Sequence, residues 1–261
     1  MRALKIAATG MEAQQNRVSV ISNNLANMST TGYKGRRAEF ADLIYQQPRR
    51  AGSINAADGS ILPAGVQLGH GVRLAAVTFD VVQGPLKATA NDLDVAIDGQ
   101  GWFEVELPNG NSAFTRDGSF KRTDEGRIVT SEGYGLVPDM TIPEDAQAVT
   151  INPDGEVYAL FDDRTQPELL GQILLATFAN EKGLEPIGDN LFVGTNASGE
   201  PVPDTAGTDR RGVIRQGYIE ESSVDAVREI TELIEAQRGY ELNSKVISAA
   251  DQMLGATTQI R

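Results

Sequence analysis

The chain repeats apolar residues every three or four positions near its N-terminus. This spacing runs unbroken from residue 4 to residue 28, and seven of its eight positions are apolar: Leu4, Ala7, Met11, Gln14, Val18, Ile21, Leu25 and Met28. A seam this narrow is typical of a helix that packs in a coiled coil. The β-branched residues Thr30 and Thr31 follow, and Gly32 is a residue type that commonly ends helices. We therefore expect the helix to stop there.

A second helix is predicted at the C-terminus. Ser222 and Asp225 have the spacing of a capping box, which places the start of this helix at Ser222. The three-four spacing then continues with five apolar positions out of eight, namely Ile230, Leu233, Gln237, Tyr240, Ser244, Ile247, Asp251 and Leu254. A neighbouring stripe holds Val246, Ala250, Met253, Thr257 and Ile260, which indicates more than one neighbour for this helix.

Neither helix can bury its apolar stripe alone, and each buried Leu or Ile side chain is worth about 1.5–3 kcal/mol. The helices therefore pair either within one chain or between chains, and their position at the chain ends favours the second arrangement. Gly10 and Gly239 each cost about 1 kcal/mol inside a helix. They either permit a close approach of the helices or are tolerated weak points.

The middle of the chain predicts short antiparallel strands. Leu93 to Ile97 alternates apolar residues with others, and an apolar run begins at Trp102. Turn dipeptides then recur every seven or eight residues, at Asn109-Gly110, Asp117-Gly118, Glu125-Gly126 and Glu132-Gly133. This spacing indicates consecutive hairpins in a meander or barrel. The expected fold class is α+β, with long terminal coiled-coil helices and a central antiparallel β-rich domain.

Residues 46–71 are rich in Gly and Pro and have little periodicity, which is typical of a linker or an exposed loop. We therefore expect three regions. Residues 1–33 and 222–261 form a helical coiled-coil domain, residues 34–75 form an extended or β linker with an insertion at 46–71, and residues 76–221 form a β-rich outer domain.

Composition excludes much of ordinary enzyme chemistry. The 261 residues carry 23 Lys and Arg against 36 Asp and Glu, a net charge of −13, which disfavours nucleic-acid binding. With no Cys and the single His70, disulfides, thiolate metal sites, cysteine nucleophiles and His-dependent triads are unsupported. We expect no catalytic residues, no metal and no cofactor. We also expect no cleaved signal peptide and no membrane insertion.

Three segments of the sequence carry a family resemblance. Residues 22–34, which read SNNLANMSTTGYK and include Asn24, Asn27, Thr31, Gly32 and Tyr33, follow the first predicted helix. Residues 91–103 (NDLDVAIDGQGWF), extended by residues 114–120 and 129–134, lie in the β region, and residues 235–247 lie in the second helix. Together these segments resemble the signatures of the bacterial flagellar rod, hook and hook-associated proteins.

Within that family, residues 46–73 resemble the insertion typical of the distal rod. The resemblance implies that this segment, represented by Gln47, Pro48, Leu62 and Pro63, packs against neighbouring subunits and stiffens a straight rod. Proximal rod proteins of similar length are the alternative. A different class of function, less favoured, is a secreted β-rich sugar-binding module or cell-wall hydrolase. That class would need a cleft with convergent carboxylates and activity as a monomer.

The resemblance also implies how the protein works. Many copies stack into a hollow helical tube, with the terminal helices as the inner coiled-coil layer and the β region outside. The chain ends are expected to order on assembly. The implied partners are further copies, proximal rod proteins, hook protein, the rings of the cell wall and outer membrane, and the flagellar type III export apparatus. The location implied is the flagellar basal body, where the rod crosses the periplasm and cell wall to the outer membrane and transmits torque to the hook.

On this reading, apolar positions of the two helices pack together within and between subunits. The expected contacts in the first helix are Leu4, Met11, Val18, Ile21 and Leu25. Those in the second helix are Ile230, Leu233, Tyr240, Ile247 and Leu254.

Overall fold

The computed structural model describes residues 2–49, 65–162, 166–209 and 211–259, and it divides into two compact units. The helical unit comprises residues 1–25, 36–78 and 226–261, and the β unit comprises residues 26–35 and 79–225. The presence of two terminal helices and a central β-rich region confirms the α+β class. The predicted three-region division stays a prediction.

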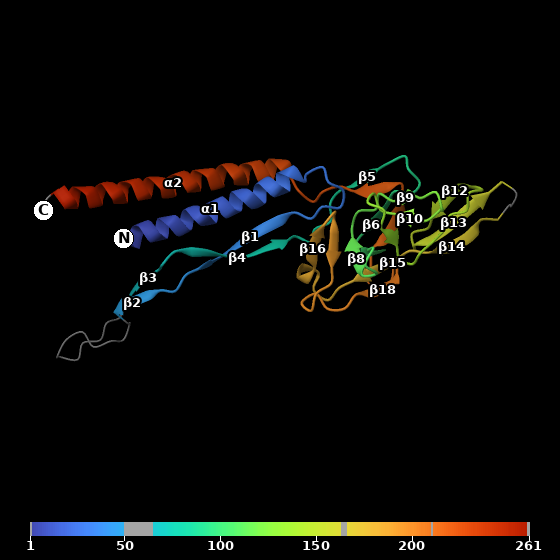
Figure 1. Ribbon diagram of the computed structural model, residues 1–261, viewed down its shortest axis with the longest axis horizontal. Coiled ribbons are helices and arrows are strands. Elements are labelled where there is room, and N and C mark those ends of the chain that lie inside the picture. Colours follow the sequence, from blue (N-terminus) through green and yellow to red (C-terminus); the bar gives the residue numbers. More distant parts are fainter. Residues whose placement is uncertain (1, 50–64, 163–165, 210, 260–261) are drawn as a thin grey trace. The chain divides into compact units, whose positions relative to one another are not determined.

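The helical unit contains α1 (Arg2–Ala26) and α2 (Ala226–Gln259), drawn in blue and red in Figure 1. Both predicted boundaries need correction. Helix α1 ends before Met28, because the chain turns through bonds from Thr30 N to Asn27 O (3.2 Å) and from Tyr33 N to Thr30 O (3.3 Å). Helix α2 begins at Ala226, so Asp225 rather than Ser222 precedes its first helical residue.

Four strands complete the helical unit, and they run as two antiparallel ribbons: β1 (Arg36–Asp42) with β4 (Val72–Phe79), and β2 (Gln46–Arg49) with β3 (Val66–Leu68). The second ribbon lies inside residues 46–71, so the prediction of a linker or loop there is wrong for its two ends. The reason is pairing between sequence-distant segments, since Gln46 lies opposite Leu68 and Arg49 opposite Val66. Leu62 and Pro63 lie outside the described residues.

The β unit is built on one large sheet. Nine strands belong to it, in the path β16-β17-β8-β7-β11-β10-β9, with β15 pairing to β7 and β18 pairing to β15. Their bounds are β7 (Trp102–Glu106), β8 (Ser112–Thr115), β9 (Lys121–Arg122), β10 (Ile128–Val129), β11 (Gly135–Leu136), β15 (Leu174–Thr177), β16 (Glu185–Gly188), β17 (Leu191–Val193) and β18 (Val202–Thr205).

Smaller sheets surround this one. A three-stranded sheet has the order β12 (Ala146–Ile151), β13 (Glu156–Phe161) and β14 (Glu168–Gln172). Two ribbons pair β6 (Val95–Asp98) with β19 (Val213–Gln216), and β5 (Leu86–Ala88) with β20 (Tyr218–Glu220). A short 3-10 helix spans Glu181–Gly183. The described strand pairs of the β unit are antiparallel, as predicted.

Three of the four predicted turns close hairpins. Asn109-Gly110 joins β7 to β8, Glu125-Gly126 joins β9 to β10, and Glu132-Gly133 joins β10 to β11. Asp117-Gly118 does not close a hairpin, because the backbone of Gly118 bonds to strand β6 instead. Gly118 O accepts a hydrogen bond from Val95 N at 2.9 Å. The prediction of an uninterrupted run of hairpins is therefore wrong at this turn.

The hydrophobic core of the β unit forms two clusters. The larger one gathers buried side chains from the large sheet and from the ribbons, including Val95, Phe103, Phe120 and Ile214. The rings of Phe103 and Phe120 meet edge to face at 5.3 Å. The smaller cluster centres on Trp102, whose ring lies 4.9 Å from that of Phe192. Burial of this size explains why the apolar runs between the turns form strands.

Candidate assembly surface and buried ionic cluster

Small residues bring α1 and α2 together in the helical unit. A Cβ atom placed on Gly10 would lie 2.9 Å from the Asn243 side chain, and one on Gly239 would lie 3.1 Å from that of Gln14. Residue numbers along α1 rise from one contact to the next while those along α2 fall, so the two helices run antiparallel. Figure 1 shows them side by side. Of the two readings of Gly10 and Gly239, the close approach is the one observed.

Polar contacts continue this helix pair toward the end of α1 and the start of α2. The Arg17 guanidinium pairs with the carboxylates of Glu232 at 3.3 Å and Glu235 at 3.7 Å. Nearer the start of α2, the Asn24 Nδ2 donates to Glu229 Oε2 at 3.3 Å. Partial burial raises the pKa of the Glu229 carboxyl. Small and polar residues therefore contribute to the contact between α1 and α2 along much of its length.

The buried positions of the two helices reflect this pairing. In α1 they are Ala7, Ala13, Ile21 and Asn24, and in α2 they are Ala236 and Ala250. The sequence analysis placed Ala7 and Ile21 in the seam of α1 and Ala250 in the second stripe of α2, but it missed Ala13 and Ala236 because it followed the large apolar residues. The signal that was available is the spacing of Ala and Gly in both helices, since small residues allow helix backbones to approach closely.

The predicted contact residues divide between two environments. In α1, Ile21 is buried and the other four are half-buried: Leu4, Met11, Val18 and Leu25. In α2, Leu233 and Ile247 are half-buried, and Ile230, Tyr240 and Leu254 are exposed. Whether these residues form a subunit interface stays a prediction.

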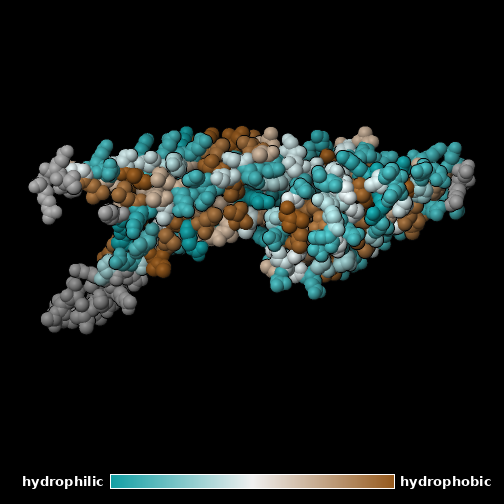
Figure 2. Space-filling model, viewed as in Figure 1, coloured by the Kyte–Doolittle hydropathy of each residue, from teal (hydrophilic) through white to brown (hydrophobic). Residues whose placement is uncertain are grey.

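Further large apolar residues of α2 are exposed besides the predicted ones. They are Val227, Ile234, Leu242, Val246 and Met253, and together with Ile230, Tyr240 and Leu254 we call them the α2 apolar face. Figure 2 shows apolar residues gathered over the part of α2 nearer its N-terminal end. Because these residues point to several sides of α2, they favour contact of this helix with more than one neighbour.

The paired strands of the helical unit bond to the N-terminal part of α1. The Arg2 guanidinium donates to Leu68 O at 2.8 Å, and Val72 N donates to Thr9 Oγ1 at 3.4 Å. Of the residues predicted to stiffen the rod, Gln47 and Pro48 lie in β2, next to the pairing with β3. The ends of the predicted insertion are therefore held against α1.

The β unit contains a buried ionic cluster, which sequence reasoning did not identify. Glu220 Oε1 accepts bonds from Lys34 Nζ at 2.6 Å and from Gly84 N at 2.9 Å, and Glu220 Oε2 lies 3.3 Å from Arg116 Nε. The side chains of Lys34 and Glu220 are each 1% exposed. We call Lys34, Arg116 and Glu220 the ionic cluster.

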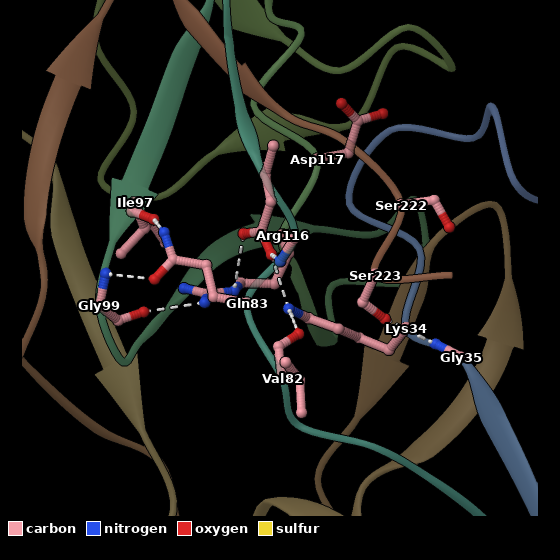
Figure 3. A network of polar contacts seen from close by, with 12 residues as sticks. Lys34, Gly35, Val82, Gln83, Ile97, Gly99, Arg116, Asp117, Ser222 and Ser223 are labelled. Carbon is pink, nitrogen blue, oxygen red and sulfur yellow. Dashed lines mark hydrogen bonds and ion pairs between the residues drawn. The ribbon is translucent and has the colours of Figure 1, made fainter. Parts of the chain in front are cut away.

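Backbone carbonyl groups accept further bonds from the two cations of the ionic cluster. Lys34 Nζ donates to Val82 O at 2.9 Å, and Arg116 donates to Gly99 O and Gly101 O at 2.8 Å each. Figure 3 shows Lys34 and Arg116 converging from different segments of the chain. Burial and the neighbouring Arg116 lower the pKa of the Lys34 ammonium, while Glu220 opposes this shift. The cluster resembles a structural ion network, because each group is paired.

The residues of the family signature lie beside the ionic cluster. Gly32 N donates to Glu220 O at 2.8 Å, and Ser223 N donates to Tyr33 O at 3.1 Å. Thr31 O accepts a bond from Asn190 Nδ2 at 3.0 Å. Gly32 has φ +67°, and a Cβ there would lie 2.7 Å from Asp117 N, so only glycine fits.

Two further signature residues act at the end of α1. Asn27 Oδ1 accepts a bond from Thr30 Oγ1 at 3.2 Å, within the turn that follows the helix. The Asn24 amide bonds both the N–H and the carbonyl group of Arg36, each at 2.8 Å, which ties α1 to β1 in the helical unit. These signature residues therefore fix the end of α1 and the turn that leads from it into β1.

The described parts of the chain contain no candidate metal-binding site. Among those residues, no three His, Asp or Glu side chains lie where they could hold a metal ion. As far as the described residues reach, neither α1 nor α2 has a run of apolar residues long enough to cross a membrane.

Three protein-family models match the chain. The model of flagella basal body rod proteins matches residues 4–34, that of the flagellar hook protein FlgE/F/G D1 domain matches residues 96–159, and that of the flagellar basal body rod FlgEFG C-terminal region matches residues 215–260. These segments cover the signature, part of the β unit and α2.

Relatives match over the full length. The flagellar basal-body rod protein FlgG of Caulobacter vibrioides is 52% identical over 261 residues, which is 100% of both chains. That of Agrobacterium fabrum is 51% identical over 97% of each chain, and that of Buchnera aphidicola from Acyrthosiphon pisum is 46% identical over 99% of each. Identity at this level, over matched lengths and with the signature in its structural place, means that the chain belongs to the FlgG family of flagellar basal-body rod proteins.

Proposed function

We propose that copies of this chain polymerise head to tail into a hollow, straight helical tube that forms the distal rod and transmits motor torque to the hook. As a member of the FlgG family the chain is a structural subunit of the flagellar basal body. The observation that supports polymerisation is the α2 apolar face, whose residues are 41–76% exposed. A repeated contact between two different surfaces that does not close on itself builds a helical assembly.

In the proposed tube, α1 and α2 of neighbouring copies form the inner coiled-coil layer. Close approach at Gly10 and Gly239 and the Arg17 ion pairs hold α1 to α2 within one copy, while exposed apolar residues of α2 such as Ile230 can contact neighbouring copies. Burying each of them stabilises the assembly by about 1.5–3 kcal/mol before the entropy of association is subtracted. Residues 1–33 and 222–261 would form this layer, residues 34–75 a connecting layer and residues 76–221 the outside.

The remaining contacts of the rod follow from the same arrangement. We propose that residues 46–71 pack between neighbouring copies and stiffen the tube, and that the ends of the tube contact proximal rod proteins and hook protein. The outside would face the rings of the cell wall and outer membrane, and the type III export apparatus would deliver the chain. The names of the full-length relatives favour this function over a proximal rod protein, a sugar-binding module or a hydrolase.

The experiment compares two matched substitutions by electron microscopy of the concentrated protein. Ile230 is 46% exposed on α2, and Leu169 is 53% exposed on β14 of the β unit. Ile230→Asp should abolish tubes, because it places a charge in the proposed inner layer, whereas Leu169→Asp should leave them intact. Circular dichroism should show that both variants fold like the unsubstituted chain. Tubes formed equally well by Ile230→Asp would refute the inner coiled-coil layer.

A further inference from the structure

The two units carry very different charges. The helical unit holds 12 Lys and Arg against 9 Asp and Glu, a net charge of +3. The β unit holds 11 Lys and Arg against 27 Asp and Glu, a net charge of −16. The whole excess of negative charge therefore belongs to the β unit, a separation that the net charge of −13 for the chain does not reveal.

Apart from the buried Glu220, the described acidic residues of the β unit lie at least partly on its surface, and one sheet concentrates them. From residue 139 to residue 162, around β12 and β13, the chain has six acidic residues and no Lys or Arg. Glu144, Asp145, Asp154 and Asp162 in this segment are exposed. Of the basic residues of the β unit, Lys34 and Arg116 are buried in the ionic cluster and Arg211 is buried as well, so they do little to offset the charge of the surface.

We propose that the acidic surface of the β unit keeps unassembled copies apart, so that copies join through the helical unit and only where dissolved ions screen the negative charge. This inference rests on the proposed function, in which β units of neighbouring copies lie side by side outside the helices. Net charge far from zero keeps proteins soluble and monomeric through mutual repulsion. The nearly neutral helical unit bears the α2 apolar face, so repulsion there does not oppose association.

The separation of charge has a consequence for assembly. Apolar association through α2 is insensitive to salt in this range, whereas repulsion between β units weakens as the screening length falls from about 30 Å at 0.01 M salt to about 10 Å at 0.1 M. The lowest protein concentration that yields tubes, the critical concentration, should therefore fall as salt rises. Removing negative charge from the β unit should have the same effect as adding salt.

The test measures critical concentration by sedimentation at about 0.01 M and about 0.1 M NaCl, using the full chain. The variant Glu144→Gln, Asp145→Asn, Asp154→Asn removes three exposed charges, and Asn tolerates the turn in which Asp154 lies. The matched control Glu144→Asp, Asp145→Glu, Asp154→Glu changes the same positions but keeps the charge. At low salt we expect the neutralised variant to assemble at a concentration about threefold lower or more than the unsubstituted chain, and the control to behave like the unsubstituted chain.

Three results would overturn the proposal. One is a critical concentration of the unsubstituted chain that does not change with salt. Another is an equal shift in the neutralised variant and in the control, which would assign the effect to side-chain shape. A third is a critical concentration that falls in MgCl2 but not in NaCl of equal ionic strength, because screening of charge depends on ionic strength and would act in both salts. Salt-independent tubes would overturn this inference alone, whereas a chain that forms no tubes in any salt would also overturn the proposed function.

Discussion

At the scale of single residues, the interior of the β unit depends on the charge of Glu220. This carboxylate faces two buried cations, Lys34 and Arg116, and also accepts a bond from Gly84 N. Such a group adds little stability when compared with well-packed apolar residues, but removing one partner leaves the other charges buried without compensation. The ionic cluster therefore makes the β unit intolerant of single changes.

Glu220→Gln should lower the free energy of unfolding of the β unit by about 3–5 kcal/mol, because Lys34 and Arg116 lose their buried counter-charge. The control is Asp98→Asn, which removes the exposed ion pair with Arg215 and should cost no more than about 1 kcal/mol. Denaturant unfolding followed by the fluorescence of Trp102, the one tryptophan of the chain, measures both. Similar losses in the two variants would contradict the importance of the cluster.

At the scale of elements, glycines of α1 and α2 serve different ends. Gly10 and Gly239 lie where the helices approach each other, with side chains of the partner helix directly over them. Gly255, also in α2, has no atom within 4 Å of the position that a Cβ would occupy. A glycine in a helix is costly without a packing reason, and only the first two have one.

Gly255→Ala should stabilise α2 by up to about 1 kcal/mol, because alanine is the better helix former and meets nothing. Gly10→Ala should forfeit this gain and lower stability, because the new methyl group displaces the Asn243 amide from its bond to Gly239 O. Thermal unfolding followed by circular dichroism at a helix band compares them. An equal gain at both positions would mean that the close approach of the helices is unimportant.

At the scale of the whole molecule, the segment between β2 and β3 bears on the mechanics of the proposed tube. Its two ends are the strands β2 and β3, which pair with each other, and β3 is bonded to α1 through Arg2. A segment held at both ends can brace neighbouring copies, whereas a free loop cannot. The proposal that residues 46–71 stiffen the rod depends on this fixed base.

Deleting residues 49–60 should leave both units folded but give tubes that curve or bend more easily, because the proposed brace between copies is shortened. The measurement is the persistence length of negatively stained tubes, compared with tubes of the unsubstituted chain. Tubes that remain straight and equally stiff after the deletion would exclude the stiffening role.

The elements of this chain were largely predictable because they depend on local patterns. The heptad spacing predicted α1, and the Asn-Gly and Glu-Gly dipeptides predicted three of the hairpins, since such signals act over a few residues. The family signature was also recognisable from residues 22–34. The paired ends of the predicted insertion were not, because β2 and β3 are stabilised by each other and neither has a signal of its own.

The sequence by itself determined that the chain has helical ends, a β-rich middle, an acidic charge and a place among flagellar rod proteins. Only the tertiary structure decided which helix face turns inward, that Lys34, Arg116 and Glu220 meet, and that negative charge belongs to one unit. The physical reason is distance along the chain. Lys34 and Glu220 are 186 residues apart, and no local pattern of apolar and polar residues records which distant charges will share one interior.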